Sequence, residues 1–198
     1  MKANDAKVTY MEPQKIIYGN NAAEIGKQLE AALTGNENLL QFTTLIEQQG
    51  RRIVLDIDID PGGGFEGGYA FTRLSAPLQA KDDFKFHLHD EGFLADVGKL
   101  FGMQDVVIGY PEFDDKVIVK TNNKDRVRNI FSDAAAREVF SSLPDFNLQI
   151  KEQEQDDQLL SFLELEIEEG IAEPERLRNV YNAFYTVLAA LDATPANL

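Results

Sequence analysis

The ten residues at 51–60 constrain the fold of this chain most strongly, because apolar and polar side chains alternate along them. One parity holds four large apolar residues: Ile53, Leu55, Ile57 and Ile59. The other parity holds Val54 and three carboxylates: Asp56, Asp58 and Asp60. A period of two with β-branched residues is typical of a strand with one buried face. The run therefore predicts a strand that packs on a core and presents carboxylates on its other side.

Neighbouring segments extend this strand into a sheet. An apolar run at 39–47 precedes it, and the Gln48–Gly50 link between the two predicts a hairpin. Further strands are expected at 69–76 and 83–89. Four strands joined by short links, without a long helix between them, predict an antiparallel meander with one solvent-facing side.

Apolar residues at helical spacing mark the later elements. Asn20 and Asn21 precede one such segment, 21–34, with Glu24 placed as in a capping box. Other helices are expected at 91–101, after Asn123, after Asp133 and after Pro174. Short strands are expected at 106–108 and 117–119, and a second hairpin at 146–151 and 159–168.

These elements predict an α+β fold with a single domain over 20–198. Its sheet is expected to be mainly antiparallel, made of the N-terminal four-stranded meander and the C-terminal hairpin. Helices pack on this sheet, among them a long C-terminal helix whose apolar stripe, Leu177 to Leu191, forms core or, alternatively, a dimer seam. Residues 1–19 are expected to be an N-terminal arm or tail. A length of 198 residues agrees with one domain.

The charge balance restricts the partners of this chain. The 34 acidic and 19 basic side chains give a net charge of −15. Such a surface repels phosphate backbones and anionic lipid, so we expect no nucleic-acid and no membrane partner. It favours a protein partner with a basic surface. Because the chain has no cysteine and no apolar leader, we expect a cytoplasmic protein.

Several segments resemble an uncharacterised group of bacterial proteins. They are Thr72-Arg73-Leu74, the Gly-Met-Gln-Asp-Val-Val-Ile-Gly turn at 102–109, Glu112-Phe113-Asp114 and the strand-to-helix stretch 117–123. The resemblance covers roughly 40–192 and implies a shared fold. It implies no activity, because the group carries none that can be transferred.

Two groups of side chains suggest a divalent metal ion. Asp56, Asp58 and Asp60 project from one strand face about 7 Å apart, and hard cations prefer such oxygen ligands. His87 and His89 share a face of another expected strand, which suits a metal bound through imidazole. If the two strands are neighbours, both histidines can face Asp56 or Asp58 in one site. Otherwise the carboxylates are a solvated strand face, and the histidines are partly exposed opposite an apolar face.

The segment Gly62–Gly68 is a glycine-rich link. It lacks the Gly-Lys-Ser/Thr ending of a phosphate-binding loop, and no helix follows it. We therefore expect a hairpin loop. Phe65 within it and Tyr69 just after it are candidate partner-binding residues, because loops often carry binding side chains.

A turn at 109–115 collects acidic residues. Glu112, Asp114 and Asp115 suit local hydrogen bonding in a turn, with acid–base chemistry as the alternative. Arg73, on an expected strand, is a candidate partner for one of these carboxylates.

The sequence thus favours a non-catalytic binding or interaction module with an acidic surface, monomeric or weakly dimeric. The alternative is a metal-binding protein or metal-dependent hydrolase that uses His87, His89, Asp56, Asp58 and Asp60. A stoichiometric metal ion would distinguish the two.

Overall fold

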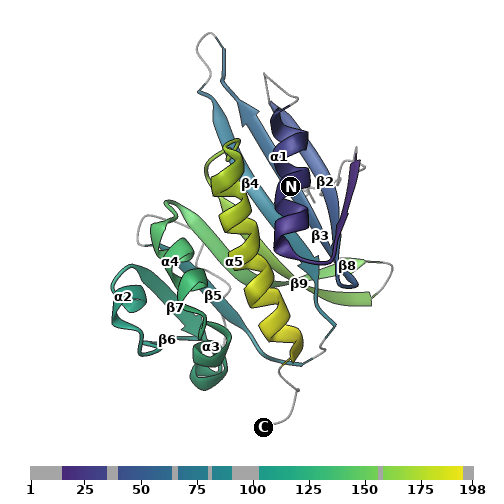
Figure 1. Ribbon diagram of the computed structural model, residues 1–198. Coiled ribbons are helices and arrows are strands. Elements are labelled where there is room, and N and C mark those ends of the chain that lie inside the picture. The colour runs from purple at the N-terminus through teal and green to yellow at the C-terminus, as the bar shows by residue number, and fades with distance from the viewer. Residues whose placement is uncertain are drawn as a thin grey trace, which may run out of the picture.

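The alternating run is strand β3 (Arg51–Asp60) in the computed structural model, and it lies within a large sheet (Figure 1). The structure describes residues 15–34, 40–63, 67–79, 82–90, 103–155 and 158–193. The other strands there are β1 (Lys15–Gly19), β2 (Gln41–Gln48), β4 (Tyr69–Pro77), β5 (Phe86–Asp90), β6 (Gln104–Asp105), β7 (Val117–Thr121), β8 (Phe146–Gln155) and β9 (Gln158–Ile167). The helices are α1 (Ala22–Thr34), α2 (Pro111–Asp114), α3 (Lys124–Ile130), α4 (Ala134–Ser142) and α5 (Pro174–Ala193).

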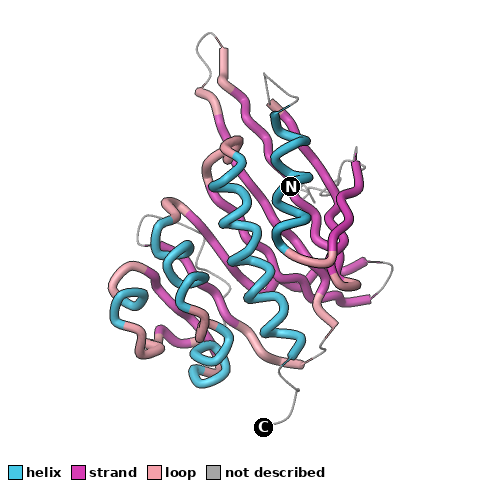
Figure 2. The backbone as a smooth tube through the Cα atoms, viewed as in Figure 1, coloured by secondary structure: helices cyan, strands magenta, loops and turns pink. Residues whose placement is uncertain are grey.

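Within these residues, the nine strands form one sheet in the order β1-β2-β3-β4-β9-β8-β5-β7-β6. Among these described strand pairs, β1 with β2 is the only parallel one. The two long helices α1 and α5 lie side by side across one face of the sheet (Figure 2). The α+β class, the C-terminal hairpin of β8 and β9 and the long last helix are therefore confirmed.

The order of the strands differs from the expected meander at one position. β2, β3 and β4 are consecutive neighbours, but β4 pairs next with β9, and β5 lies beyond β9 and β8. Each strand of the β8–β9 hairpin has ten residues, whereas β5 has only five. The hairpin therefore offers β4 the longer partner, and proximity in sequence does not decide the pairing.

The hydrophobic core lies between the sheet and the helices. Ile53, Leu55 and Ile57 of β3 are completely buried, as their parity predicts. The apolar stripe of α5 is buried along its length, at Leu177, Val180, Tyr181, Phe184, Leu188 and Leu191. This stripe is core of the single chain, which rules out the alternative in which it forms a dimer seam.

Polar side chains begin the helices as expected. The Asn21 side chain accepts a hydrogen bond from the backbone N–H of Glu24 at 3.0 Å, and the Glu24 carboxylate accepts one from the N–H of Asn20 at 2.8 Å. Asn123 and Asp133 cap α3 and α4 by accepting one backbone N–H each. These bonds satisfy donors that the start of a helix leaves unpaired.

Three further expectations concern smaller segments. The last five residues of the expected arm form β1 at the edge of the sheet, and residues 1–14 lie outside the described residues. The helix expected at 91–101 also lies outside them. The short strand expected at 106–108 is instead the two-residue strand β6, while the strand expected at 117–119 is confirmed as β7.

Candidate functional site

The sheet face opposite α1 and α5 carries a double row of side chains on β3 and β4. The antiparallel register sets Asp56 opposite Arg73, Asp58 opposite Phe71 and Asp60 opposite Tyr69. Since side chains alternate across a strand, all six project from the face opposite to the buried Leu55 and Ile57. We call these six residues the acidic–aromatic ladder, and each facing pair a rung.

The β4 side of the ladder is a continuous stack. The rings of Tyr69 and Phe71 lie 6.4 Å apart and are nearly parallel, at 11°. The guanidinium carbon of Arg73 lies 4.9 Å from the centre of the Phe71 ring. Tyr69, at the open end of the stack, is 54% exposed. The stack therefore presents an accessible aromatic ring to solvent.

The β3 side of the ladder carries carboxylates held by neutral donors. Asp58 accepts hydrogen bonds from the Tyr69 hydroxyl at 3.3 Å and from the Gln41 amide at 3.4 Å. Asp60 accepts one from the backbone N–H of Gly62 at 2.8 Å. Neither carboxylate forms an ion pair with any described residue. Their negative charge, first that of Asp58, raises the pKa of Tyr69.

Arg73 is paired, but not with the acidic turn that the sequence suggested. Its guanidinium donates to Glu166 on the neighbouring strand β9, at 3.1 Å and 3.2 Å. Asp114 accepts three backbone N–H groups of the turn, from residues 108–110, which confirms the expected local hydrogen bonding for this carboxylate. Glu112 instead forms an ion pair with Arg137 of α4, at 3.3 Å.

The two outer rungs, Asp58–Phe71 and Asp60–Tyr69, lie at the end of β3 and the start of β4, where the β3–β4 hairpin projects from the sheet (Figure 1). β2 pairs with β3 only as far as Asp58, and β9 pairs with β4 only from Thr72 onward. Tyr69 is exposed here, as expected of a partner-binding residue, while Phe65 lies outside the described residues. Sequence reasoning missed Phe71, although its two-residue spacing from Tyr69 and Arg73 indicated the shared face.

The two histidines lie elsewhere in the sheet. β4, β9 and β8 separate β3 from β5, so the carboxylates and imidazoles are four strand spacings apart, about 19 Å. His87, His89, Asp56 and Asp58 therefore do not form one metal site. No group of three or more His, Cys, Asp or Glu side chains suited to a metal occurs among the described residues.

The histidines are also more buried than the sequence suggested. His87 is 4% exposed and His89 is 7% exposed, with ring centres 4.9 Å apart. Burial, followed by the neighbouring His89, lowers the pKa of His87 to about 4. The Asn147 amide acts in the opposite direction, but neither ring nitrogen of His87 has a hydrogen-bond partner among the described residues. His87 is therefore neutral in the folded chain near neutral pH.

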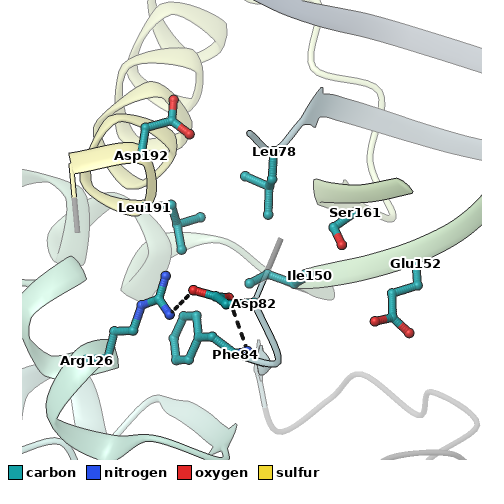
Figure 3. A pocket seen from close by; sticks show the side chains of 9 residues that line it. All are labelled: Leu78, Asp82, Phe84, Arg126, Ile150, Glu152, Ser161, Leu191 and Asp192. Carbon is teal, nitrogen blue, oxygen red and sulfur yellow. Dashed lines mark hydrogen bonds and ion pairs between the residues drawn. The ribbon is translucent and has the colours of Figure 1, made fainter. Parts of the chain in front are cut away.

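A small cavity lies beside the C-terminal end of α5 (Figure 3). Arg126 donates to Asp82 at 2.6 Å and stacks on Phe84, with its guanidinium carbon 4.0 Å from the ring centre. Arg126 Nε and Asp192 Oδ1 are buried there without a hydrogen-bond partner among the described residues. The cavity volume of about 10 Å³ admits about one water molecule, which is too small for an organic substrate.

A shallow groove of about 470 Å³ separates α4 from α5. Ala135, Ala136 and Ala183 are among the residues that line it. The Asp133 carboxylate at its end is engaged as the cap of α4. Glu138 also lines this groove, but no aromatic ring of the described residues does, so the ladder, which combines rings with carboxylates, is the stronger candidate site.

The fold and the site define an α+β protein with an acidic–aromatic ladder on the open face of its sheet. No family model and no curated protein matches the chain. Among solved structures, the chain is similar to the mycobacterial trehalose monomycolate transport factor A, TtfA, with a TM-score of 0.47 and 11% sequence identity. That similarity covers 86% of this chain and 96% of TtfA. None of the described helices is both long and apolar enough to cross a membrane.

Proposed function

We propose that this chain is a non-catalytic binding module that uses the acidic–aromatic ladder to hold a protein partner with a basic surface. The observation that carries this proposal is the combination, on two adjacent rungs, of an aromatic ring with a carboxylate that has no ion-pair partner among the described residues. A ring beside a carboxylate attracts Lys or Arg through both cation–π and charge interactions. The net charge of −15 steers such a partner toward the chain.

The alternative of a metal-dependent function receives no support from the geometry. Its carboxylates and imidazoles are separated by three strands, and the two histidines alone supply only two ligands. Zinc, for which imidazole is a favoured ligand, is held in proteins by three or more protein ligands. The binding module is therefore the function that we carry forward.

Titration of the isotope-labelled full chain with a hexa-arginine peptide, followed by amide NMR shifts, tests this proposal. We expect the largest shifts on β3 and β4, and a loss of binding in the double variant Asp58→Asn with Asp60→Asn. The matched control, Glu30→Gln with Glu138→Gln, removes two exposed charges from the helical side and should keep the binding. Binding that survives the ladder variant would show that the site lies elsewhere.

A further inference from the structure

We infer that the occupant of the ladder is an extended peptide segment with Arg or Lys at every second position, which binds alongside β4 as an added strand. This inference rests on the proposed function and specifies the shape and spacing of its partner. It depends on three observations: the open edge of β4, the spacing of the Tyr69 and Phe71 rings, and the contact that Arg73 makes with a ring and a carboxylate within the chain.

The edge of β4 is open beside the ladder. β4 pairs with β3 from Tyr69 to Ser75, but with β9 only from Thr72 onward. Among the described residues, β4 therefore has a strand on one side only at 69–71. The N–H of Ile59 donates to the carbonyl of Leu40, on the side of β3 that faces away from β4. Ile59 and Ala70 are therefore a non-hydrogen-bonded pair of the antiparallel ladder. In such a pair both residues point their backbone groups outward, so the N–H and C=O of Ala70 point toward the open edge of β4.

The course of the chain after β9 explains why this edge is open. The hydroxyl of Thr72 donates to the carbonyl of Glu169 at 2.7 Å and accepts from the N–H of Ile171 at 2.8 Å. Gly170 lies against Ile59 and Ala70, whose side chains belong to the buried parity. The chain thus crosses to the helical side after β9 and does not continue along β4. An added strand can take the position that β9 leaves.

The spacing of the rings determines the spacing of the basic residues. Side chains of a strand repeat on one face every two residues, about 7 Å apart. In a strand added beside β4, the residues opposite Tyr69 and Phe71 project on the ladder face, with Cβ atoms about 5 Å from theirs. Lys and Arg stems are long enough for one to lie over the exposed Tyr69 ring and for both to carry their charge toward Asp58 and Asp60.

The rung formed by Asp56 and Arg73 shows how a cation contacts a ring and a carboxylate within the chain. Arg73 lies over Phe71 at 4.9 Å and donates to the carboxylate of Glu166 at 3.1 Å. One cation thus engages a ring and a carboxylate together. The carboxylates of Asp58 and Asp60 have no ion-pair partner among the described residues, and no described cation lies over the Tyr69 ring, whereas Arg73 already lies over Phe71. A partner with basic residues at alternate positions would repeat the Arg73 contact at Tyr69 and place a second cation beside Asp58.

Two peptides of identical composition separate spacing from charge. One alternates, Arg-Thr-Arg-Thr-Arg-Thr. The other, Arg-Arg-Thr-Thr-Arg-Thr, has no two arginines two positions apart, and the binding of each to the full chain is measured by calorimetry. We expect the alternating peptide to bind about fivefold more tightly, the size expected from one exposed cation–π contact together with one exposed charge pair. Tyr69→Ala should remove most of this preference. Because Tyr69 is exposed, the variant should fold, which circular dichroism verifies.

The amide of Ala70 provides a second readout. Its hydrogen exchange should slow when the alternating peptide binds, because the added strand accepts its N–H. Equal binding of both peptides, lost together in the Asp58→Asn/Asp60→Asn variant, would overturn the extended-strand inference and leave the proposed function intact. Binding of neither peptide, or binding that ignores the two aspartates, would overturn the proposed function itself.

Discussion

Replacing His87 by leucine should remove a defined part, about 2 kcal/mol, of the pH dependence of stability that we expect of this chain in mildly acidic solution. The imidazole is 4% exposed, both of its nitrogens are buried without a hydrogen-bond partner among the described residues, and its pKa is lowered to about 4. Lys120 opposite it on β7 and His89 beside it both oppose a further positive charge. Folding therefore favours the neutral imidazole.

The sign and size of the effect follow from the two pKa values. The unfolded chain binds a proton at His87 below its ordinary value of 6.5, whereas the folded chain binds it only near 4. The stability contributed by neutral His87 is therefore complete above pH 6.5 and is lost as the pH falls toward 4. At about 1.4 kcal/mol for each pKa unit, the loss between about pH 7 and about pH 5 is roughly 2 kcal/mol.

The assay is urea unfolding followed by circular dichroism at several pH values, because the chain has no tryptophan to report by fluorescence. His87→Leu should lose about 2 kcal/mol less stability than the natural chain over this range. Near neutral pH it should be as stable or more stable, because leucine removes two unsatisfied nitrogens. The matched control is Gln149→Leu, which replaces a non-titrating neighbour on β8 and should keep the natural pH dependence.

A parallel pair of stability curves for the natural chain and His87→Leu would refute this reasoning. It would mean that the folded chain protonates His87 as readily as the unfolded chain does, so that water or a hydrogen-bond acceptor reaches the imidazole. A strong loss of stability in His87→Leu near neutral pH would refute the claim that the imidazole nitrogens lack partners. It would show that they form hydrogen bonds in the folded chain.

Three further substitutions test the packing, each by its change in the free energy of urea unfolding. Gly170→Ala should destabilise by about 1–3 kcal/mol, because its new methyl group would overlap Ile59; an unchanged midpoint would show that Ile59 yields at no cost. Tyr181→Phe should cost about 1–2 kcal/mol, since the buried Gln48 amide loses a 2.7 Å bond, unless water replaces the hydroxyl. Asp133→Ala should cost about 1 kcal/mol by uncapping α4, and Asp133→Asn should restore it.

Local patterns in the sequence predicted the elements of this fold, because short-range physics determines them. The alternation of β3 placed Leu55 in the core and Asp58 on the open face, and the capping box at Asn21 began α1 where it was expected. Each prediction used interactions within a few residues. The strand order of the sheet and the burial of His87 depend instead on contacts between segments far apart in the chain. No local pattern predicts such contacts.

The insertion of the β8–β9 hairpin accounts for both main differences between the expected and the observed site. By pairing with β4, it moves β5 and His87 away from the carboxylates of β3, which removes the expected metal site. By ending its pairing at Thr72, it leaves the outer part of β4 with an open edge beside Tyr69. Glu166 of the same hairpin also neutralises Arg73, so that the two outer rungs keep their negative charge. The pairing of β4 with β9 therefore excludes the expected metal site and at the same time leaves the open edge that the proposed peptide needs. The experiment with the two arginine–threonine peptides tests this edge.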